Sequence, residues 1–325
     1  MIVAVDIGGT KSRIAHLDYS QGKWALNNAK VFDSRKIDNI LQPLQEFLNP
    51  QVVGVAIGIA GPVKNNSAKI SNLDWGVDGP ALETTLKIPV LLMNDLVAHA
   101  SGLKHITFDK LSTLNKGEFS PGPMALIAAG TGLGESIIGW DGARNYPMSS
   151  EGGHCDFAPL QSADVEFWQF LHAKYGHVSW ERVVSGGDGF NNLVAFHVSQ
   201  KHPLVGDWQN TLKTNDFVAS MVGESAEQGD KFAQFIIQEF LRFYGAAAGN
   251  LALKSMPTAG MFVGGGVINK IKKWISPENF LAAFLDKGRF ANLLKTYPVH
   301  IIEDEDLALK GAAQYWQVNS GIPND

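Results

Sequence analysis

The sequence predicts an α/β protein of two domains, each built on a mixed central sheet. Hairpin patterns at residues 2–18 and 125–140 each carry a glycine-rich turn between two apolar runs. Nearly continuous apolar runs at residues 52–60 and 89–93 are typical of strands buried on both faces. Helical periodicity dominates after the second hairpin. Because the hairpin with its glycine turn occurs twice, we expect two related halves.

The first half alternates between strand and helix patterns. A third strand is expected at residues 24–32, after the first hairpin. Residues 38–48 carry apolar side chains at helical spacing, which predicts an amphipathic helix. The two buried strands follow, and a helix is expected from about residue 96. Hairpins, a helix and buried strands together indicate a mixed sheet.

The second half is richer in helix. Helices with this periodicity are expected at residues 164–174, 189–200 and 230–256. The small residues at 245–250 within the long helix favour close helix packing, and they are also compatible with a neighbouring nucleotide pocket. A buried strand at residues 260–263 ends in three glycines. A last strand at 299–302 and a helix at 306–318 are expected to return to the first domain.

These patterns give the expected domain boundaries. The small domain is expected to comprise residues 1–105 and 302–325, and the larger, helix-rich domain residues 106–301. A chain of 325 residues with 45% hydrophobic content is long enough for two cores.

Composition argues against several classes of partner. The 27 basic and 32 acidic residues are spread along the chain without a Lys/Arg run, so neither nucleic acid nor an anionic membrane is an expected partner. No signal-like segment opens the chain, and no apolar run approaches the roughly 20 residues of a membrane span. We therefore expect a cytoplasmic protein. With Cys155 as the single cysteine, and His154 and Asp156 directly adjacent to it, we expect neither a disulfide nor zinc.

The two glycine turns suggest a phosphate clamp. Glycine permits positive φ and close ligand approach, and successive N–H groups form an anion-binding concavity. Neither turn fits a Walker loop or a dinucleotide fingerprint, because a strand rather than a helix follows each. A tight hairpin turn is the structural alternative for each. The Asp6 carboxylate is a candidate for Mg²⁺, directly or through water. The expected nucleotide contacts are Asp6, Ile7, Gly8, Gly9, Thr10, Lys11, Gly130, Thr131, Gly132, Gly264, Gly265 and Gly266.

Polar residues follow the buried strand at 89–93. Asn94 and Asp95 lie where open α/β sheets present ligands, and an aspartate there can accept a hydroxyl proton during phosphoryl transfer. The structural alternative makes Asp95 the N-cap of the following helix.

A second polar group suits hydroxyl recognition. Glu151 and His154 are separated by two glycines, and Glu181 is a candidate second carboxylate. Carboxylates accept hydrogen bonds from hydroxyls, and histidine donates or accepts. The alternative is ordinary surface or packing roles for all three.

Taken together, these motifs resemble the bacterial glucokinase family. The resemblance runs from residue 6 to residue 266, with the motifs in the family's order. It rests on Asp-Ile-Gly-Gly-Thr at 6–10, Asn-Asp at 94–95, Gly-Thr-Gly-Leu-Gly at 130–134, Glu-Gly-Gly-His at 151–154 with Asp-Phe-Ala-Pro at 156–159, the segment 177–186 and the glycines at 264–266.

The resemblance implies an actin-like ATPase fold, with two ribonuclease H-like domains flanking a cleft. It also implies transfer of phosphate from ATP to the 6-hydroxyl of glucose, giving glucose 6-phosphate and ADP, with Mg²⁺. Asp95 would be the general base, and a homodimer is expected. The implied sugar contacts are Asn94, Asp95, Glu151, His154 and Glu181.

Three other functions compete with this one. A kinase of the repressor/kinase/open-reading-frame group acting on another hexose or an amino sugar is the nearest, although many of that group carry a Cys-rich zinc motif. A sugar-responsive repressor needs a DNA-binding segment, yet five residues precede Asp6. An actin- or chaperone-like ATPase switch would not need a second site for hydroxyls.

Overall fold

The computed structural model describes residues 1–70, 73–214 and 219–321. The chain forms two compact units. The first comprises Met1–Leu111, Tyr146–Ser149 and Asp304–Asp325, and the second comprises Ser112–Asn145 and Ser150–Glu303. The domain boundaries expected from the sequence stay a prediction.

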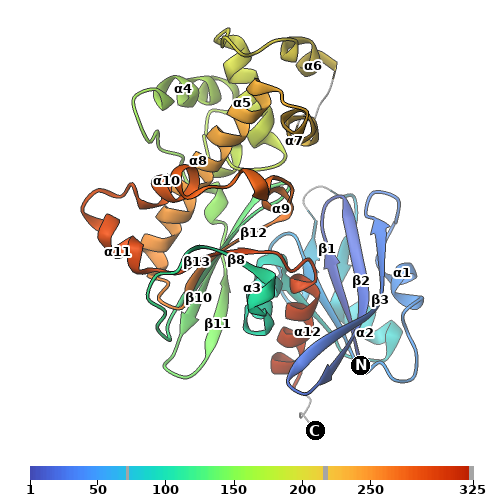
Figure 1. Ribbon diagram of the computed structural model, residues 1–325. Helices are drawn as coiled ribbons and strands as arrows, with labels where there is room; N and C mark the ends of the chain where they lie inside the picture. Colours follow the sequence, from blue (N-terminus) through green and yellow to red (C-terminus); the bar gives the residue numbers. More distant parts are fainter. Residues whose placement is uncertain (71–72, 215–218, 322–325) are drawn as a thin grey trace. The chain divides into compact units, whose positions relative to one another are not determined.

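The first unit is built on a mixed five-stranded sheet in the order β3-β2-β1-β4-β7 (Figure 1). The three antiparallel strands are β1 (Ile2–Ile7), β2 (Lys11–Ser20) and β3 (Lys23–Asp33). The two strands β4 (Val55–Ile59) and β7 (Val90–Asn94) continue the sheet parallel to β1. The predicted hairpin, third strand and buried strands are confirmed.

Side chains of β1 alternate between two apolar layers of this unit. Val3 and Val5 face one core, and Ile2 and Ala4 face the other. The elements on the first side are α1 (Leu41–Gln45), α2 (Gly79–Leu86) and a ribbon of β5 (Ser67–Lys69) and β6 (Gly76–Asp78). The helices on the other side are α3 (Asp95–Gly102) and α12 (Leu307–Asn319).

Helix α12 packs closely on α3, as Figure 1 shows. A Cβ atom on Gly311 would lie 1.8 Å from the carbonyl oxygen of Ala98, so only glycine permits this approach. The expected return of the C-terminal helix to the first sheet is thus confirmed.

Helix α1 is shorter than the predicted helix at 38–48. Pro43 lacks an amide proton and is tolerated only in the first turn, so the helix begins at Leu41. The Asn39 side chain accepts the Leu41 amide at 3.0 Å. Pro50 disfavours helical backbone at the residue before it, which limits the other end.

A six-stranded sheet has the order β11-β10-β9-β12-β13-β8, and its strands other than β11 belong to the second unit. The predicted second hairpin is β9 (Met124–Ala129) and β10 (Leu133–Trp140), which are antiparallel. The strand β12 (Gly260–Gly264) is parallel to β9 and to β13 (Val299–Ile302). The edges are β8 (Leu111–Asn115) and β11 (Asn145–Ser149). The expected return of strand 299–302 to the first domain was wrong, because β13 pairs with β12.

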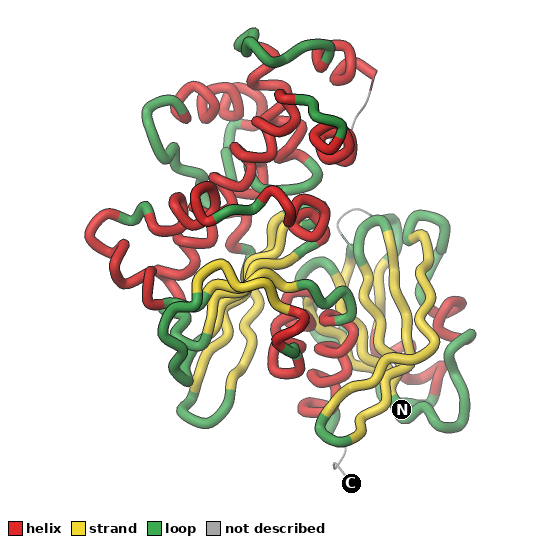
Figure 2. The backbone as a smooth tube through the Cα atoms, viewed as in Figure 1, coloured by secondary structure: helices red, strands yellow, loops and turns green. Residues whose placement is uncertain are grey.

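The remaining α-helices, drawn in red in Figure 2, belong to the second unit. The longest is α8 (Lys231–Ser255), along which Gly245 and Gly249 lie against the carbonyls of Phe280 and Phe284. The predicted close packing at 245–250 is confirmed. The others are α4 (Asp164–Tyr175), α5 (Asp188–Ser199), α6 (Trp208–Thr214), α7 (Ala219–Glu227), α9 (Gly266–Ile271), a π-helical turn (Pro277–Leu281), α10 (Ala282–Leu285) and α11 (Ala291–Thr296).

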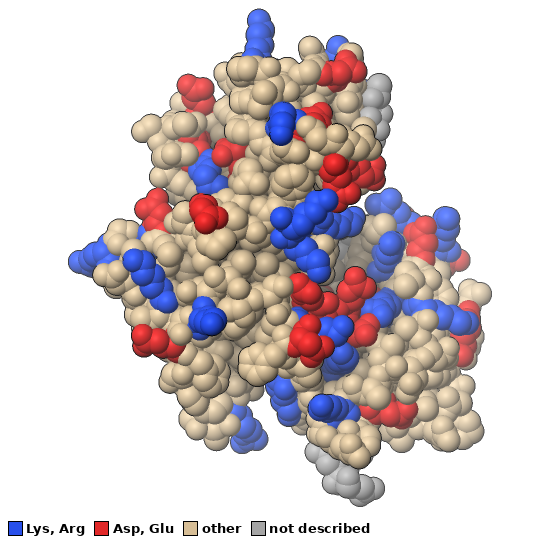
Figure 3. Space-filling view, viewed as in Figure 1, with Lys and Arg blue, Asp and Glu red and all other residues tan. Residues whose placement is uncertain are grey.

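Acidic and basic side chains are interspersed on the face drawn in Figure 3, as the nearly equal numbers of acidic and basic residues predict. Over the described ranges, none of the helices has the length and apolar character needed to cross a bilayer.

Candidate active site

The first glycine turn joins β1 to β2 in the first unit. The Gly8 amide donates to the carbonyl of Lys11 at 2.9 Å, which closes the turn. Within the described ranges, the amides of Gly9 and Thr10 have no acceptor in the protein. Two adjacent N–H groups are therefore available to an anion at the tip of the hairpin.

Ser34 braces this turn from the end of β3. Its amide donates to the Thr10 carbonyl at 3.0 Å and its hydroxyl to the Gly8 carbonyl at 2.8 Å. The Ser12 hydroxyl lies 2.9 Å from the Ser34 hydroxyl, and both side chains are buried. Sequence reasoning missed Ser34 because nothing in its local pattern marks it.

Asp6 and Asp95 lie at the same end of the first sheet, near the carboxyl ends of β1, β4 and β7. Asp6 pairs with Gly58 in the register of β1 and β4. A Cβ atom on Gly58 would lie 3.1 Å from the Cβ atom of Ala98, so this glycine lets helix α3, which begins with Asp95, pack closely on the sheet. Burial raises the pKa of Asp6, while His99 and Arg13 oppose that rise.

Asn94, rather than Asp95, caps helix α3. The Asn94 side-chain oxygen accepts the Leu96 amide at 3.0 Å, and its amide group donates to the Gly61 carbonyl at 3.2 Å. Asp95 is the first helical residue. Its carboxylate stands in the first turn, where the helix dipole favours negative charge. The N-cap position is therefore Asn94 and not Asp95, although the Asp95 Oδ1 atom also accepts the Leu96 amide, at 2.8 Å.

The second glycine turn joins β9 to β10 in the second unit. The Gly130 amide donates to the Gly132 carbonyl at 2.9 Å, and in the described ranges no protein group accepts from the amides of Thr131 and Gly132. The amides of Gly186 and Gly187 donate to the carbonyls of Gly130 and Thr131 at 2.7 and 3.0 Å. The carbonyl groups of the turn are thus hydrogen-bonded within the protein, while the amides of Thr131 and Gly132 remain available to a ligand.

Glu181 lies against this second turn. Its Oε2 atom accepts the Leu133 amide at 3.0 Å. A Cβ atom on Gly132 would lie 2.3 Å from the same oxygen, so a larger residue there would displace the Glu181 carboxylate from this position. The sequence pointed to Glu181 as a candidate sugar ligand, and its contact with the second glycine turn was missed.

The loop that carries Glu151 and His154 lies beside the segment that carries Glu181. The Trp180 amide donates to the Cys155 carbonyl at 3.0 Å, and Asp156 forms a β-bridge with Ser179. His154 Nε2 lies 4.0 Å from Glu151 Oε2, and both side chains are more than half exposed. Two carboxylates and an imidazole are therefore gathered in neighbouring segments and accessible to a polar ligand.

The glycines after β12 adjoin the second turn. Gly265 has φ of 94°, and a Cβ atom on it would lie 2.2 Å from the Ala129 carbonyl oxygen. Gly266 starts α9 and has open space around it. The backbone at 264–266 thus packs directly against the strand that leads into the turn at 130–134.

A family model for glucokinase matches residues 3–319. The chain belongs to the glucokinase family. A curated glucokinase from Nostoc sp. is 36% identical, and the match covers 96% of this chain and 98% of the relative.

Solved structures support the fold expected for this family. A glucokinase from an Antarctic psychrotroph has a TM-score of 0.81 at 23% identity, over 97% of this chain and 98% of that one. A repressor/kinase/open-reading-frame family glucokinase from Streptomyces griseus, solved with glucose and AMPPNP, has a TM-score of 0.68 at 22% identity, over the same shares. The expected actin-like ATPase fold, α/β with mixed sheets, is confirmed.

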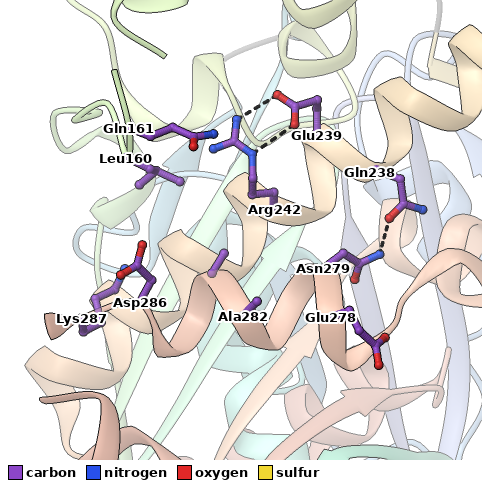
Figure 4. A pocket seen from close by; sticks show the side chains of 11 residues that line it. Leu160, Gln161, Gln238, Glu239, Arg242, Glu278, Asn279, Ala282, Asp286 and Lys287 are labelled. Atoms are coloured by element: carbon purple, nitrogen blue, oxygen red, sulfur yellow. Dashed lines mark hydrogen bonds and ion pairs between the residues drawn. The ribbon is translucent and has the colours of Figure 1, made fainter. Parts of the chain in front are cut away.

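A separate groove of the second unit contains none of the candidate residues (Figure 4). It has a volume of about 610 Å³. Arg242 lies at its wall, paired with Glu239 and with Asp164. These ion pairs neutralise the Arg242 guanidinium within the helical part of the second unit. Over the described ranges, no cluster of three His, Cys, Asp or Glu side chains suits a metal ion, and Cys155 is exposed and unpaired.

Proposed function

We propose that this chain transfers the γ-phosphoryl group of ATP to the 6-hydroxyl of glucose, giving glucose 6-phosphate and ADP. The observation that carries the proposal is the Glu181 carboxylate, which contacts the second glycine turn and belongs to the segment beside Glu151 and His154. One residue thereby joins a candidate phosphate site to a candidate hydroxyl site. An ATPase switch has no need for that junction.

The nucleotide is held mainly by backbone groups. The amides of Gly9, Thr10, Thr131 and Gly132 are donors for phosphate oxygens. The residues at 264–266 offer a flat backbone for the adenosine. The AMPPNP bound to the Streptomyces griseus glucokinase supports ATP as the donor here.

Asp6 fits a role with Mg²⁺. Its half-buried carboxylate stands beside the first turn and supplies a hard oxygen ligand, which Mg²⁺ prefers alongside phosphate oxygens and water. When bound, the ion would neutralise phosphate charge. Asp6 would hold it directly or through water.

Asp95 is proposed as the general base. As the sugar O6 atom forms its bond to the γ-phosphorus, the bond from phosphorus to the ADP oxygen breaks and the hydroxyl proton passes to the Asp95 carboxylate. Asn94, Glu151, His154 and Glu181 would hold the other hydroxyls, since carboxylates and amide oxygens accept from them.

We also propose a cytoplasmic homodimer, for which the family resemblance is the support. Sedimentation of the purified chain at micromolar concentration tests the dimer directly. A single species with the mass of one chain would contradict it.

ADP release measured with different sugars tests the proposed function. Glucose should give the highest kcat/KM among glucose, mannose, fructose and N-acetylglucosamine, and ATP turnover without sugar should be negligible. A preference for another sugar would favour a related hexose or amino-sugar kinase. Fast ATP turnover without sugar would contradict the kinase proposal.

A further inference from the structure

Tyr244 carries its hydroxyl from helix α8 to the end of the second sheet. The side chain is fully buried, and its Oη atom accepts the Ala129 amide at 3.0 Å. The same oxygen lies 3.0 Å from the Gly264 carbonyl and 3.2 Å from the Ile127 carbonyl. A phenol has one proton, so the hydroxyl accepts from the Ala129 amide and shares its proton between the two carbonyls, of which that of Gly264 is nearer. One hydroxyl therefore bonds to both β9 and β12.

These backbone groups lie where both glycine segments of the second unit begin. The last rung in the register of β9 and β12 pairs Ala128 with Gly264. Directly after it, β9 enters the turn at 130–134 and β12 enters the glycines at 265–266. Gly265 also packs against Ala129, as its missing Cβ allows. The Tyr244 hydroxyl thus stands at the common origin of the two segments.

Aromatic packing fixes the position of the Tyr244 ring. It makes edge contacts with Phe240 and Phe280, with ring centroids 5.9 and 5.8 Å away. Burial raises the pKa of Tyr244, so the hydroxyl keeps its proton and remains a donor. A side chain fixed in this way determines where the two strands end relative to one another.

We propose that Tyr244 is a positioning residue for the nucleotide, whose hydroxyl fixes the spacing between the turn at 130–134 and the glycines at 264–266. The inference rests on the proposed function, because those segments are the proposed phosphate and adenosine contacts. Tyr244 itself touches no substrate. It acts through the backbone of Ala129 and Gly264.

Calorimetric titration of Tyr244→Phe with AMPPNP and, separately, with glucose tests this role. The variant keeps the ring and removes the hydroxyl. We expect about tenfold weaker AMPPNP binding, equivalent to about 1.4 kcal/mol, with glucose binding within about twofold of the unmodified protein. Tyr175→Phe is the matched control, because it also removes one tyrosine hydroxyl bond of the second unit, to Asn192 at 3.0 Å. It should leave AMPPNP binding unchanged.

The possible failures are distinguishable. If the unmodified chain binds neither AMPPNP nor glucose, the proposed function itself fails. If it binds both, but Tyr244→Phe binds AMPPNP as tightly or loses both ligands equally, the positioning role is overturned. Hydrogen exchange in the unmodified protein gives a test that needs no variant. AMPPNP should protect residues 129–134 and 264–266 together, and protection of one segment alone would contradict the proposal.

Discussion

The Glu181 carboxylate accepts a hydrogen bond of 3.0 Å from the Leu133 amide, at the point where the second glycine turn enters β10. Glu181 belongs to the segment beside the Glu151 and His154 loop. A change at Glu181 should therefore reach both the proposed phosphate contacts and the proposed sugar contacts.

Replacing Glu181 should separate these two effects. Glu181→Gln retains an oxygen that can accept the Leu133 amide but loses the negative charge. We therefore expect kcat/KM for glucose to fall at least about tenfold, while KM for ATP changes less than about threefold. Glu181→Ala removes the acceptor as well and should raise both KM values. Steady-state kinetics with each substrate varied provide the measurement. Glu166→Gln, at an exposed position of α4, is the control. Identical kinetics of the Gln and Ala variants would contradict the coupling.

Asp95→Asn should abolish most turnover without abolishing sugar binding. The amide cannot accept the hydroxyl proton, so kcat should fall by at least about 100-fold, the low end for a positioned base. Calorimetry should give a glucose Kd within a few-fold of the unmodified chain. Asp109→Asn is the matched control, since Asp109 is an exposed aspartate of the same unit. Near-normal kcat in Asp95→Asn would remove Asp95 from its role.

Gly265→Ala and Gly266→Ala should differ sharply in stability. A Cβ atom at 265 would meet the Ala129 backbone at 2.2 Å in a residue with φ of 94°, whereas one at 266 meets nothing within 4 Å. We expect Gly265→Ala to lower the free energy of unfolding by about 2 kcal/mol or more. Gly266→Ala should stay within about 0.5 kcal/mol. Urea denaturation measures both. Equal midpoints for the two variants would show that the backbone at 265 is not as tightly packed as described.

Acidification should destabilise the second unit through His197. Burial among the aromatic rings of Phe196 and Phe235 lowers its pKa from 6.5 to about 4. Between these values the unfolded chain binds a proton that the folded chain does not, so the free energy of unfolding falls as pH drops through this window. Above about pH 6.5 the contribution is fully retained.

The measurement compares urea midpoints at about pH 7 and about pH 5 for the unmodified chain and His197→Gln. Glutamine does not titrate, so the variant should lose less stability on acidification, even if it is less stable at both pH values. A pH dependence identical to that of the unmodified chain would remove His197 as a cause.

Much of the fold was predictable because the hydrophobic period is a local signal. The glycine hairpins, the buried strands and the long helix follow directly from which residues are apolar and how they are spaced. Pro43 shortened the expected helix at 38–48, and that signal was present in the sequence. The partner of β13 was not predictable, since an apolar alternation indicates a strand but not the sheet it joins.

The candidate site also contains residues that local motifs indicate and residues that only tertiary contacts reveal. Residues in motifs, such as Asp95 and Glu151, were chosen as candidates from their neighbours in the chain, and their roles stay a prediction. Ser34 and Tyr244 were missed because they act through backbone atoms of segments far away in the sequence. The hydrogen bond from Leu133 to Glu181 is equally invisible in a one-dimensional pattern. Such contacts depend on tertiary packing, which neither residue type nor spacing encodes locally.

The most direct test of the proposed function is to identify the product by phosphorus NMR after the purified chain reacts with ATP, Mg²⁺ and glucose. The account predicts that glucose 6-phosphate and ADP accumulate in equal amounts, with no inorganic phosphate beyond the level found without enzyme. Inorganic phosphate in place of a sugar phosphate, or phosphate on a hydroxyl other than the sixth, would contradict it.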